Sequence, residues 1–214
     1  YIRALDSDRK WDFTPLAKPG QTVTAGETLG TVPEGIFTHR VMAPFALAGS
    51  CKVESVVPAG QYTVEQEIAV LVDESGKKIP VKMVQSWPVK RALNVSRRRL
   101  MPEHPLVTRV RIIDSMFPIL RGGTYCIPGP FGAGKTVLQQ ITSRHAEIDI
   151  VIIAACGERA GEVVETLREF PHLQDPRTGK SLMERTIIIC NTSAMPVAAR
   201  EASVYTAATL AEYY

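Results

Sequence analysis

A glycine-rich stretch in the second half of the chain constrains its fold more strongly than any other feature. It satisfies the pattern G-x-x-x-x-G-K-[ST] at every position, with Gly129, Pro130, Phe131, Gly132, Ala133, Gly134, Lys135 and Thr136. An apolar run at 124–127 precedes it, and the segment after it has Val137, Leu138 and Ile141 at spacings that fit one face of a helix. Such a loop between a strand and a helix is typical of phosphate binding. The sequence therefore predicts a nucleotide site over 129–137, with a chance glycine-rich turn as the alternative.

The glycines, the lysine and the threonine of this loop each suit phosphate binding for a physical reason. The glycines at 129, 132 and 134 lack a Cβ, so the backbone can adopt positive φ and bring N–H groups close to phosphate oxygens. The N-terminus of the following helix also favours negative charge. Lys135 would reach the β- and γ-phosphates, and the Thr136 hydroxyl would bind Mg²⁺. The predicted cofactors are ATP or ADP together with Mg²⁺.

Composition narrows the class of protein. The chain has 214 residues, 45% of them hydrophobic and 22% charged, as in ordinary globular domains. A net charge of +3, from 25 basic and 22 acidic residues, gives no reason to expect nucleic acid as a partner. No apolar stretch approaches about 18 residues, so no membrane span is predicted. Four dispersed cysteines without a C-x-x-C pair indicate free thiols in a reducing cytosol.

Residues 1–90 have the pattern of an all-β domain, with short alternating runs between Gly- and Pro-containing turns. A weak repeat, at 19–23 and 58–64, indicates two similar hairpin units about 40 residues apart in a small barrel or sandwich. The segment 20–26 resembles biotinyl and lipoyl carrier domains. No lysine lies between Lys18 and Lys52 to carry the swinging arm, so only the scaffold of those carriers is expected.

The second half changes to alternating strands and helices. Strands are predicted at 124–127, 148–155 and 185–190, and helices at 135–146, 161–170 and 197–214. Continuous apolar strands with helices between them indicate a parallel sheet with flanking helices, the α/β P-loop NTPase fold. Residues 175–179 are predicted to form a turn. Because the chain starts at Tyr1 and stops within a helical pattern, we expect a segment of a longer protein.

Glu158 follows one of these predicted strands, at the sheet edge where Lys135 also lies. Its carboxylate could accept a hydrogen bond from the water that attacks the γ-phosphate. The alternative is a structural glutamate that caps the next helix or pairs with Arg159, and spacing alone does not separate the two. Glu162 and Glu165 on that helix are predicted to lie on a solvated face.

Several phrases resemble the catalytic A subunit of V-type and archaeal-type rotary ATPases. They are WPV at 87–89, IDSMFP at 113–118, GGT at 122–124, IPGPFG at 127–132, GER at 157–159 and NTSAMPVAAREAS at 191–203. The resemblance covers nearly the whole chain, and several of these phrases are absent from the related F-type β subunit. Residues 1–90 look like the extra bulge insertion of the A subunit. The chain departs from the family at Ala160-Gly161, where Gly-Asn is usual.

The resemblance implies roles for the site residues. Lys135 and Thr136 would bind phosphate and Mg²⁺, Glu158 would position the hydrolytic water, and Arg159 would help to organise the site. An arginine finger would come from the adjacent B subunit of an alternating hexamer. Residues 91–214 would be the first part of the nucleotide-binding domain and would end before the Walker B strand. The chain alone is therefore expected to hydrolyse ATP poorly or not at all.

The resemblance also implies a cellular setting. The intact enzyme would hydrolyse or synthesise ATP and transport protons or sodium ions, peripherally on the cytoplasmic face of a membrane. Central and peripheral stalk subunits would be partners, and the membrane sector only an indirect one. The alternatives are another ring-forming ATPase, of the secretion or RNA-translocating type, and, for residues 1–90, a non-enzymatic module that docks stalk subunits.

Overall fold

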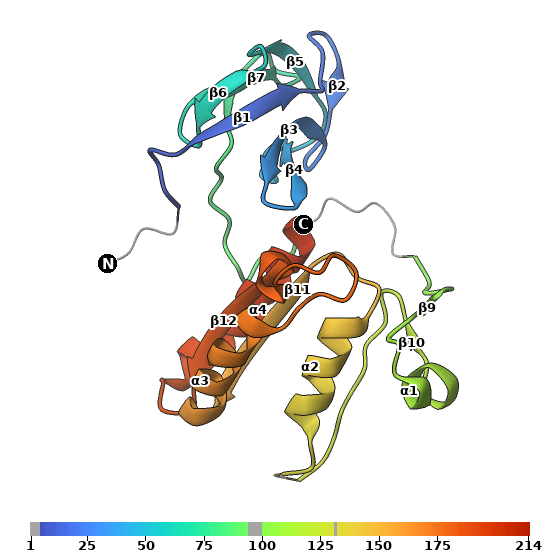
Figure 1. Ribbon diagram of the computed structural model, residues 1–214. Coiled ribbons are helices and arrows are strands. Elements are labelled where there is room, and N and C mark those ends of the chain that lie inside the picture. The colour runs from blue at the N-terminus through green and yellow to red at the C-terminus, as the bar shows by residue number, and fades with distance from the viewer. Residues whose placement is uncertain (1–4, 94–99, 131) are drawn as a thin grey trace. The chain divides into compact units, whose positions relative to one another are not determined.

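The computed structural model describes residues 5–93, 100–130 and 132–214, so Phe131 of the predicted loop lies outside the described residues (Figure 1). The chain divides into two compact units, one up to residue 97 and one from residue 98 to 213. The first is all-β and the second mixes helices and strands. Within the described ranges, no helix is long and apolar enough to cross a membrane.

The first unit contains two four-stranded antiparallel sheets (Figure 1). One sheet has the order β4-β3-β1-β6, formed by β1 (Lys10–Pro15), β3 (Thr28–Glu34), β4 (Phe37–Met42) and β6 (Gly60–Thr63). The other has the order β2-β5-β7-β8, formed by β2 (Thr22–Val23), β5 (Cys51–Val56), β7 (Glu67–Val72) and β8 (Lys78–Lys82). Alternate side chains of both sheets, including Phe13, Leu29, Val53 and Leu71, form one buried core.

The internal repeat corresponds to two equivalent strand–turn–strand units. The first copy comprises β2 and β3, and the second comprises β6 and β7. In the matching turns, the Glu27 N–H donates to the Thr24 carbonyl at 3.1 Å and the Gln66 N–H to the Thr63 carbonyl at 3.2 Å. The prediction of simple hairpins is wrong, because the two strands of each copy belong to different sheets. Each copy therefore crosses from one sheet to the other.

Gly30 in β3 occupies a place where the backbone approaches the core closely. A Cβ at this position would overlap the ring of Phe13 and lie 2.7 Å from the Thr14 carbonyl oxygen. Gly30→Ala is therefore expected to lower the free energy of unfolding of this unit by about 1–3 kcal/mol. Urea denaturation measures the loss. Thr38→Ala, at an exposed position of β4, is the control, and equal stability of both variants would contradict the prediction.

The second unit begins with small elements and continues as an α/β unit. The small elements are β9 (Pro105–Leu106), α1 (Arg111–Met116) and β10 (Ile119–Leu120). The α/β part contains α2 (Lys135–His145), β11 (Val151–Glu158), α3 (Ala160–Glu169), β12 (Thr186–Thr192) and α4 (Val197–Tyr213). Two 3₁₀ turns, η1 (Phe170–His172) and η2 (Leu182–Arg185), connect α3 to β12.

Strands β11 and β12 pair in parallel, as predicted, from Val151 opposite Thr186 to Cys156 opposite Asn191. Helix α4 packs along both strands, and α3 contacts both as well (Figure 1). The predicted helices agree with α2, α3 and α4 to within one residue at each end. The strand predicted at 148–155 begins and ends three residues later, so Glu158 is its last residue rather than part of the following turn.

Two other predictions for this unit are wrong. Residues 124–127 do not form a strand, because none of the described residues offers this segment a hydrogen-bonded ladder partner. Helix α2 has no buried residue, and Val137 and Ile141 on its predicted packing face are exposed. An amphipathic pattern predicts which face can be buried. It does not supply the element that covers that face.

Two charged residues, Asp175 and Arg185, are almost completely buried, with 1% and 2% exposure. Arg185 Nε lies 2.9 Å from Asp175 Oδ2. The Arg185 Nη atoms also donate to the carbonyls of Ser143, Arg144 and Ile148 at 3.1–3.3 Å. Ser143 and Arg144 belong to the last turn of α2, where carbonyls lack intrahelical donors. The turn predicted at 175–179 is confirmed, but its buried carboxylate, which fixes the end of α2 through Arg185, was not predicted.

Candidate functional site

The glycine-rich loop leads directly into the first turn of α2. Gly132 and Gly134 have φ of +76° and +80°, and Gly134 is the N-cap of the helix. These angles match the positive φ predicted for both glycines. For Gly129 that prediction is wrong, since its φ is not in this region. A Cβ on Gly129 would lie 3.2 Å from the Ala133 Cβ, so a side chain there would require a shift of a few tenths of an ångström.

Lys135 lies at the first position of α2 and folds back over the loop. Its Nζ donates to the carbonyl oxygens of Gly129 at 2.8 Å and of Pro130 at 2.7 Å. The side chain is half-buried, whereas Thr136 and Val137 are exposed at the helix start. A positive charge thus lies at a helix N-terminus, where the first backbone N–H groups have no intrahelical acceptor, an arrangement that favours an anion.

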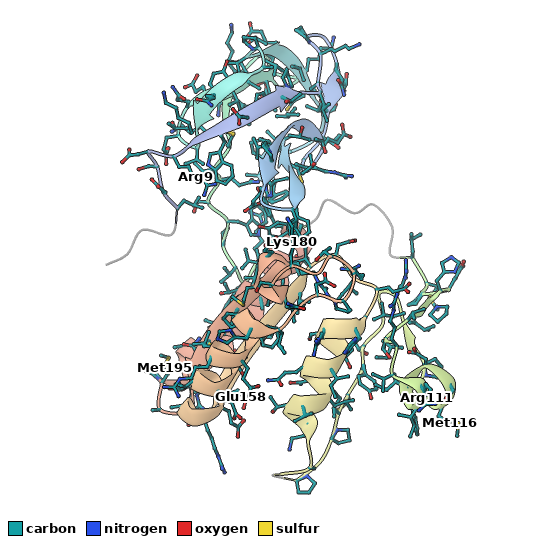
Figure 2. The ribbon with its side chains drawn as sticks, viewed as in Figure 1. Arg9, Arg111, Met116, Glu158, Lys180 and Met195 are labelled. Carbon is teal, nitrogen blue, oxygen red and sulfur yellow. The ribbon has the colours of Figure 1, made fainter. Side chains whose placement is uncertain are left out.

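Glu158 ends β11 immediately after a bulge. Gly157 has no partner in the register with β12 and adopts a φ of +93°. The Glu158 carbonyl then accepts a hydrogen bond from the Ser193 N–H at 2.8 Å. Figure 2 shows Glu158 and Met195, which lies in the loop after β12, at the same end of the strand pair. The bulge and this hydrogen bond together fix the backbone of Glu158 at the carboxyl edge of the parallel strands.

The surroundings of Glu158 connect it to two other charged residues. Burial raises the pKa of its carboxyl, a hydrogen bond with the Glu162 carboxyl raises it further, and the Lys135 ammonium lowers it. The Glu158 side chain remains solvent-exposed, so water screens part of each interaction. Lys135 and Glu158, which were predicted to share a site, therefore interact electrostatically.

Glu162 is the site residue that sequence reasoning missed. It was predicted to lie on a solvated face of the next helix, but it is half-buried in the first turn of α3 and contacts Glu158. A signal was present in the sequence, because a glutamate four residues after Glu158 falls in the first helical turn, close to the end of β11.

Arg159 is the N-cap residue of α3 and makes no side-chain cap hydrogen bond. The alternative in which Glu158 caps this helix is wrong, because Glu158 belongs to β11.

Among the described residues, no group of three or more His, Cys, Asp or Glu side chains could hold a metal ion.

Replacing Glu158 with Gln is expected to raise the free energy of unfolding near neutral pH by less than about 1 kcal/mol. A carboxyl whose pKa is raised by folding opposes folding when it is ionised, and this effect disappears as the pH falls below its ordinary value of 4.5. Urea denaturation near neutral pH and near pH 4 measures the difference. Glu165→Gln, at an exposed position of α3, is the control. A Glu158→Gln variant less stable than wild type near neutral pH would contradict this expectation.

A glycine-rich loop with a lysine at the start of a helix, beside a glutamate at the carboxyl edge of parallel strands, defines a P-loop nucleotide-binding fold, here preceded by a β barrel-sandwich. Two family models match the chain. Residues 2–90 match the barrel-sandwich domain of ATP synthase alpha/beta subunits, and residues 109–214 match the nucleotide-binding domain of the ATP synthase alpha/beta family. The chain belongs to the ATP synthase alpha/beta family.

Individual relatives agree with this assignment. The chain is 64% identical to the V-type ATP synthase alpha chain of Treponema denticola, 60% to that of Borrelia garinii and 61% to that of Borrelia duttonii. Each match includes all of this chain but only 36–37% of the relative's length. A solved ATPase structure from a bacterial type III secretion system matches 57% of this chain and covers 34% of its own, with 29% identity and a TM-score of 0.48.

Proposed function

We propose that this chain is the part of a V/A-type rotary ATPase catalytic A subunit that binds Mg-ATP and Mg-ADP. The assembled enzyme would couple ATP hydrolysis or synthesis to proton or sodium transport. The observation that carries this proposal is the position of Lys135 at the start of α2, folded over the glycine-rich loop, together with that of Glu158 at the carboxyl edge of β11. A phosphate-binding cation and a carboxylate beside it are what hydrolysis of a γ-phosphate requires.

The proposed roles follow from position. The loop residues 129–137 hold the phosphates with backbone N–H groups and Lys135, and the Thr136 hydroxyl is a ligand of Mg²⁺. Glu158 accepts a hydrogen bond from the attacking water. Arg159, directly after it at the start of α3, helps to organise the site. Lys135 and Mg²⁺ would offset the negative charge of the phosphates, whereas Glu158 would act on the attacking water.

The remaining parts of the proposal concern assembly. Residues 1–90 form the bulge insertion and contact stalk subunits, and residues 91–214 form the first part of the nucleotide-binding domain. The B subunit of an alternating hexamer supplies the arginine finger, without which hydrolysis by this chain is negligible. The assembly lies on the cytoplasmic face of a membrane. No nucleic acid is involved, in line with the nearly balanced charge of the chain.

Calorimetric titration of the chain with Mg-ADP tests nucleotide capture. Lys135→Ala is expected to weaken binding by roughly 10- to 100-fold, because a charged hydrogen bond to phosphate contributes about 1.5–3 kcal/mol. Lys180→Ala is a matched control, since the Lys180 side chain is exposed and its ammonium forms a surface ion pair with Glu184 at 3.5 Å. Binding that is unaffected by Lys135→Ala, or equally weakened by both changes, would refute the proposed phosphate site.

A further inference from the structure

The bulge that precedes Glu158 is covered by an arginine from α4. A Cβ at Gly157 would lie 3.0 Å from Arg200 Cδ and 3.2 Å from Arg200 Nη1. The Arg200 side chain, with Cδ and guanidinium nitrogens, therefore occupies the space beside Gly157, the one residue of β11 that has no partner in β12. Arg200 Nε is buried and has no hydrogen-bond partner among the described residues. Arg200 thus meets the bulge by packing, and Cδ is its atom nearest to a Cβ built at Gly157.

The start of α4 is held rigidly against β12. Asn191 of β12 donates through its side chain to the Ala199 carbonyl at 3.3 Å and also contacts the buried Ser203 hydroxyl. Ser203 in turn donates to the Ala199 carbonyl at 3.0 Å. The Arg200 N–H donates to the Pro196 carbonyl at 3.2 Å. These bonds fix the backbone on both sides of Arg200, so its side chain is aimed at Gly157 by the fold.

The direction of the Glu158 side chain depends on the bulge. In a regular strand, successive side chains point to opposite faces, so a one-residue irregularity changes which face the next side chain takes. The positive φ of Gly157 and the adjacent hydrogen bond from Ser193 set this irregularity. Removing the stem that packs on Gly157 would let the bulge relax and move the Glu158 carboxyl. Displacement of a catalytic group by about 1 Å is enough to lower a rate by up to 10²-fold.

We propose that Arg200 is a positioning residue for Glu158, acting through its stem on the Gly157 bulge. This inference rests on the proposed function of Glu158. The rival role is a direct contact between the Arg200 guanidinium and the nucleotide. The two roles differ in what they require, because positioning needs the apolar stem of the side chain whereas a phosphate contact needs its charge.

Turnover of the assembled ATPase separates these roles. Arg200→Ala is expected to lower kcat by about 10- to 100-fold while KM for ATP stays within about 3-fold of wild type. Arg200→Met restores an unbranched stem without charge and is expected to recover most of the lost kcat. Arg168→Ala removes an exposed arginine of α3 and is the control. Losses of kcat from Gly157→Ala and Arg200→Ala should be less than additive, because the two changes share one contact, although the strain of an alanine at a φ of +93° is separate from it.

Three results would overturn the inference. They are an unchanged kcat for Arg200→Ala, a Met variant as deficient as the Ala variant with raised KM, and additive losses in the Gly157 and Arg200 double variant. Failure of the proposed function has a different signature, which is a wild-type assembly without ATP turnover. In that case, urea unfolding of the single and double variants of this chain would still measure the coupling free energy between Gly157 and Arg200. A failure of the inference and a failure of the proposed function are therefore distinguishable.

Discussion

Glu158→Gln in the assembled ATPase is expected to lower kcat by about 10²–10⁴-fold, the usual contribution of a group that handles a proton in the transition state. Gln keeps the size of the side chain and its hydrogen-bonding capacity, but it loses the charge that orients and polarises the attacking water. Binding of Mg-ATP should change little, because in the proposed site the loop and Lys135, rather than Glu158, hold the phosphates. Steady-state hydrolysis and calorimetric binding measure the two quantities separately.

Glu165→Gln provides a matched control for this loss, since Glu165 is an exposed glutamate of α3. It should leave both kcat and binding unchanged. If Glu158→Gln retained wild-type turnover, Glu158 would be a structural residue, and Glu162, the other carboxylate beside it, would become the candidate. A loss of binding equal to the loss of turnover would instead assign Glu158 to ground-state recognition.

Asp175→Asn is expected to lower the free energy of unfolding of the second unit by about 3–5 kcal/mol, because it leaves the Arg185 guanidinium buried without the carboxylate that it pairs with. The two side chains are almost inaccessible to solvent and lie 2.9 Å apart. Burial lowers the pKa of Arg185, and the Asp175 carboxylate opposes that shift. Urea denaturation measures the loss, and Glu184→Gln, which removes only an exposed pair with Lys180, should change stability by less than about 1 kcal/mol.

The effect of Asp175 should also depend on pH. Burial alone raises the pKa of this carboxyl, but the Arg177 N–H and the charges of Arg185 and Arg177 lower it below its ordinary value of 3.8. A carboxyl whose pKa is lowered by folding stabilises the protein above its ordinary pKa, and this contribution is lost as the pH falls through the lower folded value. The difference in the free energy of unfolding between wild type and Asp175→Asn should therefore become smaller at acidic pH. A constant difference would point to packing rather than charge.

Much of the fold follows from local sequence patterns. The helices α2, α3 and α4 have bounds close to those predicted, because apolar spacing and Pro or Gly boundaries act over a few residues. The parallel pairing of β11 and β12 follows from their continuous apolar runs. The barrel-sandwich follows from turn spacing and from the repeat, although the crossing of each repeat between two sheets depends on pairing that only the folded chain reveals.

The features that were not predicted depend on distant partners. A run such as 124–127 becomes a strand only beside another strand, and the exposure of Val137 depends on what packs against α2. Asp175 and Arg185 are separated in sequence and resemble ordinary surface charges until the fold buries them together. In the candidate site, the loop and Glu158 were predicted, because motif and strand order indicate them. The contact of Glu162 with Glu158 depends on the angle at which α3 leaves β11.

The hydrogen bonds of Lys135 to the Gly129 and Pro130 carbonyls have a consequence for affinity. A phosphate that binds this lysine competes with two acceptors from its own loop, so binding is an exchange of partners rather than a simple addition. The dissociation constant then reports the difference between two sets of charged hydrogen bonds. A change in the loop backbone that weakens the internal set would tighten nucleotide binding without touching the nucleotide.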